Sequence, residues 1–388
     1  MVRVGVMWMV VALWPACTVG PGTVGFGDGD APAGDAPGGD ESSGDAGGGD
    51  EAPGGDEDLA GPLTAIPTLD FPNGIAVTED HVFVVIGEEH TNPGSVPVAA
   101  GTRSVVQVFA VTDGRWVKDI DVPAGGHAMR LTPDGSEIYV AHFSMDRVVS
   151  AISTSTLEVV VEIGGGPQMD ILVVDSVAVS EDGAWVYVAS NGQNTAHISR
   201  IATADHAVDT GWRIPVVGGY TCWVEGSPEP GVLYTNSWTG GTVQRKLIDT
   251  QSPDGTAAVG DYPHAVIIDP TGAFVYALVS GGNTVVKLEA STMTEISRLV
   301  GPYFGFWGGP VSGVWSKSKK TAFIVNYGVD SVAAIDLDPE SGTYETSIGT
   351  FDVGAGPIFA ALSPDGETLY VANNSGSTIS VVDVSGYP

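Results

Sequence analysis

The sequence predicts an all-β fold, a seven-bladed β-propeller with four-stranded antiparallel blades. An aromatic residue recurs seven times in short apolar runs, at spacings close to 47 residues. Gly is abundant, with 54 residues, and only 16% of the chain is charged, which suits a turn-rich β protein. A period of about 40 to 50 residues with several short strands per unit is typical of propellers. The seven aromatic residues are Phe83, Tyr139, Tyr187, Tyr234, Tyr276, Phe323 and Tyr370.

The first 17 residues have the pattern of an export signal. One Arg precedes an apolar run that is too short to span a bilayer but fits the core of a signal peptide. Ala16-Cys17 resembles the lipobox of bacterial lipoproteins, which implies that Cys17 is lipidated, although Trp14 stands where that family usually has Leu. The alternative is an ordinary secretory signal with an incidental Cys. Both alternatives predict an exported protein of the bacterial cell envelope, in the periplasm or at the outer membrane and cell surface.

Residues 18–60 have a different composition, with 14 Gly, 11 acidic residues and no Lys or Arg. Such a segment cannot bury an apolar core, and its like charges repel one another. We therefore expect a disordered acidic tether that separates the anchor from a folded domain at 61–388.

The charge of the chain restricts its partners. The formal net charge is −32, with 15 Lys and Arg against 47 Asp and Glu. An acidic surface repels nucleic acid and anionic lipid, so we expect no nucleic-acid partner and membrane contact only through a lipid anchor. We expect a monomeric propeller whose partner is a small ligand or an envelope protein.

Four units of the repeat are clear. Leu-Thr-Pro-Asp-Gly at 131–135 precedes Ile-Tyr-Val-Ala-His, and similar turn-and-strand pairs begin at 179, 268 and 362. The Gly supplies the positive φ that a tight turn between two strands requires. This pattern resembles the YVTN-type propeller repeat, with the closest matches at 187–191 and 370–374. The resemblance implies seven blades in an exported bacterial protein, and it extends over residues 63–386.

The ends of the chain predict how the ring closes. The last unit stops before a fourth strand, whereas residues 63–69 form a strand-like run ahead of the first unit. We expect this run to complete the last blade as its outermost strand, where Pro67 is tolerated because one side of that strand is unpaired.

The first strand of each blade is expected to start at one face of the ring, here called the top face. Counting back from the turns places Asn73, His127, Asp175 and His264 near the mouth of the central channel, together with Ile358. Imidazoles and carboxylates gathered there would suit a transition metal such as copper, zinc or iron. The alternative is that each His binds backbone carbonyls. The five candidate metal ligands are His127, His142, His264, His90 and Glu88.

Aromatic residues form a second candidate surface on the top face. The segment 301–310 contains Tyr303, Phe304, Phe306 and Trp307 among Gly and Pro, and Trp238 is expected to lie across the mouth from it. Exposed rings could stack on a sugar, another ring or a peptide. The alternative is a loop that packs on itself and plugs the channel.

Three functions remain open from the sequence, of which the third, an acidic metal-scavenging surface protein, rests on charge alone. The first is a non-catalytic propeller that binds a ligand or partner protein through Asn73, Asp175, Trp238 and the aromatic segment. The second is a metal-dependent enzyme or redox accessory protein with its metal on the histidines. Propeller active sites leave no contiguous motif, because they are assembled from several blades.

Overall fold

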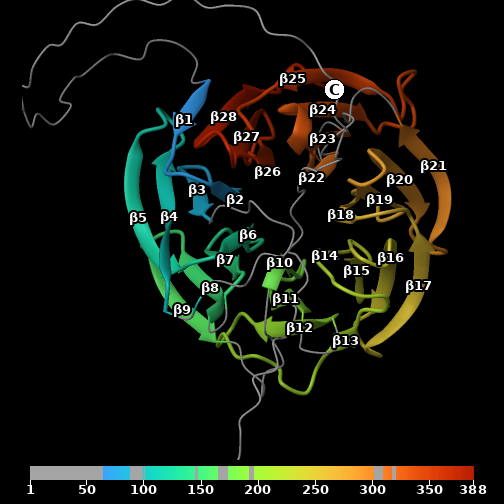
Figure 1. Cartoon of the computed structure of the whole chain (residues 1–388), viewed down its shortest axis with the longest axis horizontal. Helices are drawn as coiled ribbons and strands as arrows, with labels where there is room; N and C mark the ends of the chain where they lie inside the picture. Colours follow the sequence, from blue (N-terminus) through green and yellow to red (C-terminus); the bar gives the residue numbers. More distant parts are fainter. Residues whose placement is uncertain are drawn as a thin grey trace, which may run out of the picture.

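The chain is described from a computed structural model, which covers residues 64–87, 99, 101–144, 147–164, 174–191, 196–300, 309–316 and 320–388. Seven four-stranded antiparallel sheets are arranged as blades around a common axis (Figure 1). The predicted seven-bladed β-propeller is thus confirmed.

Each blade is built from four strands that follow one another outwards from the axis. The innermost strands are β2 (Pro72–Val77), β6 (Gly126–Leu131), β10 (Val174–Val179), β14 (Val224–Gly226), β18 (Pro263–Ile268), β22 (Pro310–Ser316) and β26 (Pro357–Leu362). The second strands are β3 (His81–Ile86), β7 (Glu137–His142), β11 (Trp185–Asn191), β15 (Val232–Ser237), β19 (Phe274–Val279), β23 (Thr321–Asn326) and β27 (Thr368–Asn373).

The two outer layers complete the blades. The third strands are β4 (Arg103–Ala110), β8 (Arg147–Ser153), β12 (Ala196–Ala202), β16 (Thr242–Leu247), β20 (Thr284–Glu289), β24 (Ser331–Asp336) and β28 (Thr378–Asp383). The outermost strands are β5 (Trp116–Pro123), β9 (Glu158–Gly164), β13 (Ile214–Pro215), β17 (Ser252–Ala258), β21 (Thr294–Val300), β25 (Ser347–Asp352) and β1 (Ala65–Pro67). A short 3₁₀ helix, η2 (Tyr327–Val329), follows β23.

The recurring aromatic residue lies on the second strand of every blade and has at most 3% of its surface exposed. These rings and the Val and Ile residues beside them fill the space between neighbouring sheets, as the alternation of a strand with two buried faces requires. The repeat therefore reflects one packing position used seven times.

The Asp-Gly and Thr-Gly turns between first and second strands have the predicted geometry. Gly135, Gly183, Gly272 and Gly366 have φ between 70° and 75°. Each donates its N–H to the carbonyl three residues earlier, at 2.8–2.9 Å. A Cβ atom is disfavoured at these φ values, which explains why Gly recurs at this turn.

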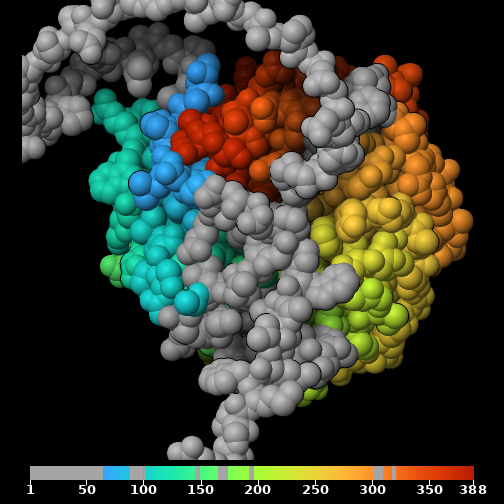
Figure 2. All heavy atoms as spheres, in the orientation of Figure 1, coloured from blue at the N-terminus to red at the C-terminus, as the bar shows by residue number. Residues whose placement is uncertain are grey.

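Strand β1 closes the ring. It pairs antiparallel with β28, with Ile66 opposite Ile379 and Pro67 opposite Thr378. The prediction that residues 63–69 complete the last blade is confirmed for the three residues of β1. Figure 2 shows the first described residues (blue) packed directly against the C-terminal blade (red). Ile66, only 1% exposed, belongs to the main hydrophobic core.

The two ends of the ring axis are distinguished by the loops that lie there. The innermost strands begin at the top face and run towards the bottom face, where the turns to the second strands lie. Within the described residues no helix is long and apolar enough to cross a membrane.

Candidate functional site

At the top of the innermost strands, one side chain at each junction between blades bonds to the backbone of the next blade. We call this ring of contacts the belt. Each donor bonds a carbonyl oxygen at the start of the neighbouring innermost strand. The contacts are Asn73 Nδ2 to Gly126 O (3.3 Å), His127 Nδ1 to Asp175 O (2.7 Å), Asn191 Nδ2 to Thr221 O (2.7 Å), Asn236 Nδ2 to Pro263 O (2.6 Å), His264 Nδ1 to Val311 O (2.8 Å), Ser312 Oγ to Ile358 O (2.7 Å) and Asn374 Nδ2 to Pro72 O (3.3 Å).

The belt gives structural roles to three of the predicted site residues. Asn73, His127 and His264 are at most 3% exposed and each bridges two blades. A carbonyl oxygen can only accept, so the two histidines carry a proton on Nδ1. These contacts of His127 and His264 agree with the alternative interpretation of the sequence, in which each His binds a backbone carbonyl. Ile358, at the same level, is buried and accepts from Ser312 through its carbonyl oxygen.

His142 is held inside blade two. Its side chain is fully buried, and Nε2 lies 2.9 Å from Ser150 Oγ on the adjacent strand β8. Burial and, to a smaller extent, the charge of Arg103 lower the pKa of His142 to about 3, so the ring is neutral at pH 7.

Only some of the predicted metal ligands belong to the residues that the structure describes. In the described part of the chain, no three His, Cys, Asp or Glu side chains lie close enough together to hold a metal ion. The candidate ligands Glu88 and His90 lie outside the described residues. His127, His142 and His264 therefore do not form a three-ligand site by themselves, and a site that also uses Glu88 or His90 stays a prediction.

Asp175 is the predicted top-face residue with the most unusual environment. It is fully buried, and its Oδ2 accepts hydrogen bonds from Tyr220 OH (2.5 Å) and Asn191 Nδ2 (3.0 Å). Within the described residues its Oδ1 has no hydrogen-bond partner. Burial raises the pKa of Asp175 to about 7, against the opposing effect of the two hydrogen bonds.

The predicted aromatic surface is only partly described. Trp238 lies at the top face, half-buried, with its ring 4.6 Å from that of Tyr262, which is 47% exposed. Tyr303, Phe304, Phe306 and Trp307 lie outside the described residues, as does Cys17. Of the predicted surface the structure therefore describes Trp238 alone, in contact with Tyr262, which the sequence did not single out.

A cavity of about 660 Å³ lies on the axis towards the bottom face. Its wall is formed by the lower halves of the innermost strands, and its rim by turn residues such as Pro133, Glu181 and Pro270. This volume is typical of sites for small organic ligands. The sequence did not predict a site at this end of the axis.

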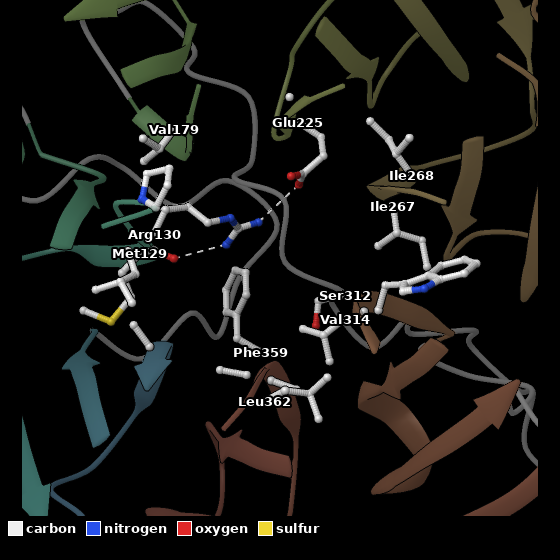
Figure 3. A pocket seen from close by; sticks show the side chains of 18 of the residues that line it. Met129, Arg130, Val179, Glu225, Ile267, Ile268, Ser312, Val314, Phe359 and Leu362 are labelled. Atoms are coloured by element: carbon white, nitrogen blue, oxygen red, sulfur yellow. Dashed lines mark hydrogen bonds and ion pairs between the residues drawn. The ribbon is translucent and has the colours of Figure 1, made fainter. Parts of the chain in front are cut away.

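An ion pair crosses this cavity (Figure 3). Arg130 of β6 and Glu225 of β14 come from blades two and four, and Nη2 lies 3.4 Å from Oε2. Each side chain is 28% exposed, so both reach the cavity surface. Arg130 Nη1 also donates to Met129 O at 3.1 Å, which fixes the direction of the guanidinium group.

Glu225 is held from a second side by Trp223, whose Nε1 donates to Oε2 at 3.2 Å. Burial raises the pKa of Glu225, while Arg130 and the Trp223 hydrogen bond oppose that shift. A carboxyl group with a raised pKa and a cationic neighbour, both lining a cavity, is a common arrangement at functional sites.

Aromatic rings close the inner end of the cavity. Trp223 stacks on Phe359, with centroids 6.1 Å apart and planes 13° apart, and both rings are at most 5% exposed. The guanidinium carbon of Arg130 lies 5.0 Å from the Trp223 ring centroid, within cation–π range. Phe359 also meets His127 edge-on at 5.5 Å, which connects this aromatic pair to the belt.

The irregular start of blade four positions Trp223. The backbone N–H groups of Cys222 and Trp223 both donate to Asn236 Oδ1 at 3.0 Å, and Thr235 Oγ1 donates to Trp223 O at 2.7 Å. Side chains thus replace strand pairing ahead of the short strand β14, and they fix the backbone from which Trp223 enters the axis.

One signal in the sequence could have revealed this site. The innermost strands are apolar on both faces, and within their bounds the charged residues are Arg130, Asp175 and Glu225. A charge in such a strand costs free energy unless it is paired. Two of the three meet in the cavity, and the third is the buried Asp175 near the belt.

Comparisons with known proteins agree with the fold. A family model described as lactonase, 7-bladed β-propeller, matches residues 174–386. No curated protein matches the chain. Among solved structures, hydrazine synthase of Kuenenia stuttgartiensis matches with a TM-score of 0.67 and 19% identity, over 85% of this chain and 98% of that chain. A chain of the mitotic checkpoint complex matches with a TM-score of 0.64 and 14% identity, over 87% and 97%.

Proposed function

Because the chain belongs to the family of seven-bladed β-propeller lactonases, we propose that it hydrolyses a lactone in the cavity between Arg130 and Glu225. The main support is the pairing of these two side chains on the cavity surface, 3.4 Å apart. Ester hydrolysis needs a base that activates water and a positive group beside the carbonyl oxygen. Glu225 and Arg130 supply one group of each kind.

The reaction assigns one role to each side chain. Glu225, as the carboxylate, removes a proton from a water molecule while the water oxygen attacks the lactone carbonyl carbon. Arg130 donates hydrogen bonds to the oxygen on which negative charge develops. When the ring C–O bond breaks, Glu225 returns the proton to the leaving alkoxide, and the product is an open-chain hydroxy acid.

The surroundings of the pair favour these roles. Burial raises the pKa of Glu225, which makes its carboxylate a stronger base than an exposed Glu. Arg130 keeps its orientation through Met129 O and the Trp223 ring, so little ordering is required when substrate binds.

Hydrolysis of a panel of γ- and δ-lactones by the purified protein tests the proposal, with acid release followed at constant pH. Glu225→Gln should lower kcat by about 10²- to 10⁴-fold, the usual contribution of a general base. Arg130→Met should lower it by about 10²- to 10³-fold. Glu345→Gln is the matched control, because Glu345 pairs with Lys287 away from the cavity. A kcat that is unchanged in Glu225→Gln would exclude this mechanism.

A second candidate is binding without catalysis at the top face. The Trp238–Tyr262 ring pair favours it, because exposed aromatic edges suit stacking on a ligand or partner protein of the cell envelope. The predicted aromatic segment 303–307 would belong to the same surface, whereas Asn73 and Asp175 are fully buried. Trp238→Ala would then weaken ligand or partner binding and leave lactone hydrolysis unchanged, whereas Glu225→Gln would have the opposite effect.

We also propose that the protein is exported and held at the cell envelope by a lipid on Cys17. The apolar run before Ala16-Cys17 and the acidic composition of residues 18–60 support this placement. Because lactones diffuse across membranes more readily than their hydroxy-acid products, an exported lactonase would act on substrates arriving from either side.

A further inference from the structure

The mouth of the cavity is lined by apolar side chains from almost every blade. The sixth residue of six of the seven innermost strands lines the cavity, as does the last residue of the short strand β14, and we call this set the collar. It consists of Val77, Leu131, Val179, Ile268, Trp315 and Leu362, with Gly226 in blade four. Leu131, Val179, Ile268 and Leu362 are half-buried, as expected for side chains that face the cavity.

The polar groups in the wall are largely engaged with the protein. Ser312 Oγ donates to Ile358 O at 2.7 Å, and Ser180 Oγ donates to Asp182 Oδ1 at 2.6 Å. Trp223 Nε1 donates to Glu225. A ligand with many hydroxyl groups would therefore leave several of them without partners in the cavity, which weakens binding.

The charges also disfavour a multiply charged ligand. Arg130 shares its positive charge with Glu225, and a second carboxylate, Glu181, lies at the rim. The whole protein has a formal net charge of −32, so its field repels anions. A phosphate group would meet one neutralised cation and two carboxylates.

From this distribution we propose that the substrate is a hydrophobic lactone: a ring ester whose carbonyl lies at Arg130 and Glu225 and whose alkyl or aryl substituent lies within the collar. The inference rests on the proposed lactone hydrolysis for the reaction, but on the cavity wall alone for the substituent. A preference for an apolar substituent would distinguish this cavity from one that binds sugar lactones or their phosphates.

The test compares γ-lactones of increasing alkyl chain length with glucono-δ-lactone and its 6-phosphate. Both kcat/KM and the binding of each hydroxy-acid product, followed by tryptophan fluorescence, are measured. We expect kcat/KM to rise about fourfold for each added methylene until the cavity is filled, as burial of a methylene predicts. The sugar lactones should be at least about 100-fold poorer, because each unpaired hydroxyl weakens binding.

Substitutions in the collar test whether its side chains cause the dependence of kcat/KM on chain length. Leu362→Ser and Val179→Ser should each flatten the dependence of kcat/KM on chain length, with a loss that grows with the length of the alkyl substituent. Val382→Ser is the matched control, because Val382 packs on the same hydrophobic cluster as Leu362 but does not line the cavity. Thermal unfolding of all three variants shows whether each is folded.

The possible results separate the two proposals. Equal or faster hydrolysis of the sugar lactones would overturn the hydrophobic substrate and leave lactone hydrolysis standing. Chain-length-dependent binding without any hydrolysis would overturn the reaction and support the apolar ligand class. Absence of both binding and turnover would overturn both.

Discussion

The Nδ1 atom of His264 lies 2.8 Å from the carbonyl oxygen of Val311, and this contact joins blade five to blade six. Equivalent contacts at the other junctions close the belt around the axis. A residue that the sequence suggested as a metal ligand is therefore part of a cyclic set of hydrogen bonds from side chains to main-chain oxygens. Substitution of His264 should therefore lower the stability of the propeller rather than weaken the binding of a ligand.

His264→Ala should lower the free energy of unfolding by about 1 to 3 kcal/mol, because it leaves the buried Val311 oxygen without its donor. His264→Asn should recover part of the loss, since Asn73 makes the same bond in blade one. Urea unfolding of the three proteins measures the effect. A fully stable His264→Ala protein would show that the belt contact contributes nothing at this junction.

The pairing of β1 with β28 should contribute measurably to the free energy of unfolding. Ile66→Ala removes a side chain that is 1% exposed, so we expect a loss of about 2 to 4 kcal/mol. Leu69→Ala, at a position that is 50% exposed, should change stability by less than about 0.5 kcal/mol. Denaturant midpoints of both variants test this. Equal effects would mean that β1 does not hold the last blade in solution.

Two buried groups should give opposite pH dependences of stability. The folded pKa of Asp175 is raised to about 7, so its contribution is present below the ordinary Asp value of 3.8 and is lost as the pH rises through 7. The folded pKa of His142 is lowered to about 3, so its contribution is present above the ordinary His value of 6.5 and is lost as the pH falls through 3. The two effects nearly cancel between these limits.

Single substitutions should reveal the separate contributions of Asp175 and His142 to the pH dependence of stability. Asp175→Asn should make the protein less stable as the pH falls from 7 to 4, whereas His142→Gln should make it more stable over the same range. Each slope should integrate to at most about 4 kcal/mol, from shifts of roughly three pKa units. Thermal melts at several pH values measure both. Parallel profiles for the two variants would contradict the assignment.

The proposed base sets the pH dependence of activity. Burial raises the pKa of Glu225, and the carboxylate is the active form. We therefore expect kcat/KM to rise with pH and to level off above a midpoint higher than the ordinary Glu value of 4.5. This limb should be missing from the residual activity of Glu225→Gln. A bell-shaped profile, or an unchanged limb in the variant, would point to another group.

The lipid on Cys17 can be tested directly. When the full chain is expressed in a bacterium supplied with labelled palmitate, the protein should be labelled and found with membranes. Cys17→Ser should abolish the label and leave the propeller soluble in the exported fraction. Labelling that persists in Cys17→Ser would contradict the anchor, and release of unlabelled wild type would favour an ordinary secretory signal.

The sequence predicted the ring well because one packing position repeats. The aromatic residue between sheets, the Gly of the turn and the closing run ahead of the first blade each depend on local pattern. The structure has all three where they were expected, and it adds the register of the closing strand, with Ile66 opposite Ile379. These features recur with the period of the blade, so counting along the chain was enough to place them.

The site at the bottom face could not be found in this way. Glu225 and Trp223 belong to blade four, which lacks the Asp-Gly turn from which positions were counted. Their placement depends on Asn236 and Thr235, which replace strand pairing at the start of that blade. His127 and His264 were placed at the right level, but their partners are backbone oxygens of neighbouring blades, which carry no signal in the sequence.

The pairing of β1 with β28 also sets an order of events during biosynthesis. The first strand of the domain leaves the ribosome about 310 residues before its only partner in the sheet, so it must wait with both edges open. Pro67 lacks a backbone N–H and therefore weakens pairing with a wrong neighbour during that wait. A nascent or truncated chain that ends before Thr378 lacks β28, so β1 cannot pair and the last blade stays incomplete. The ring can therefore close only after the whole domain has been synthesised.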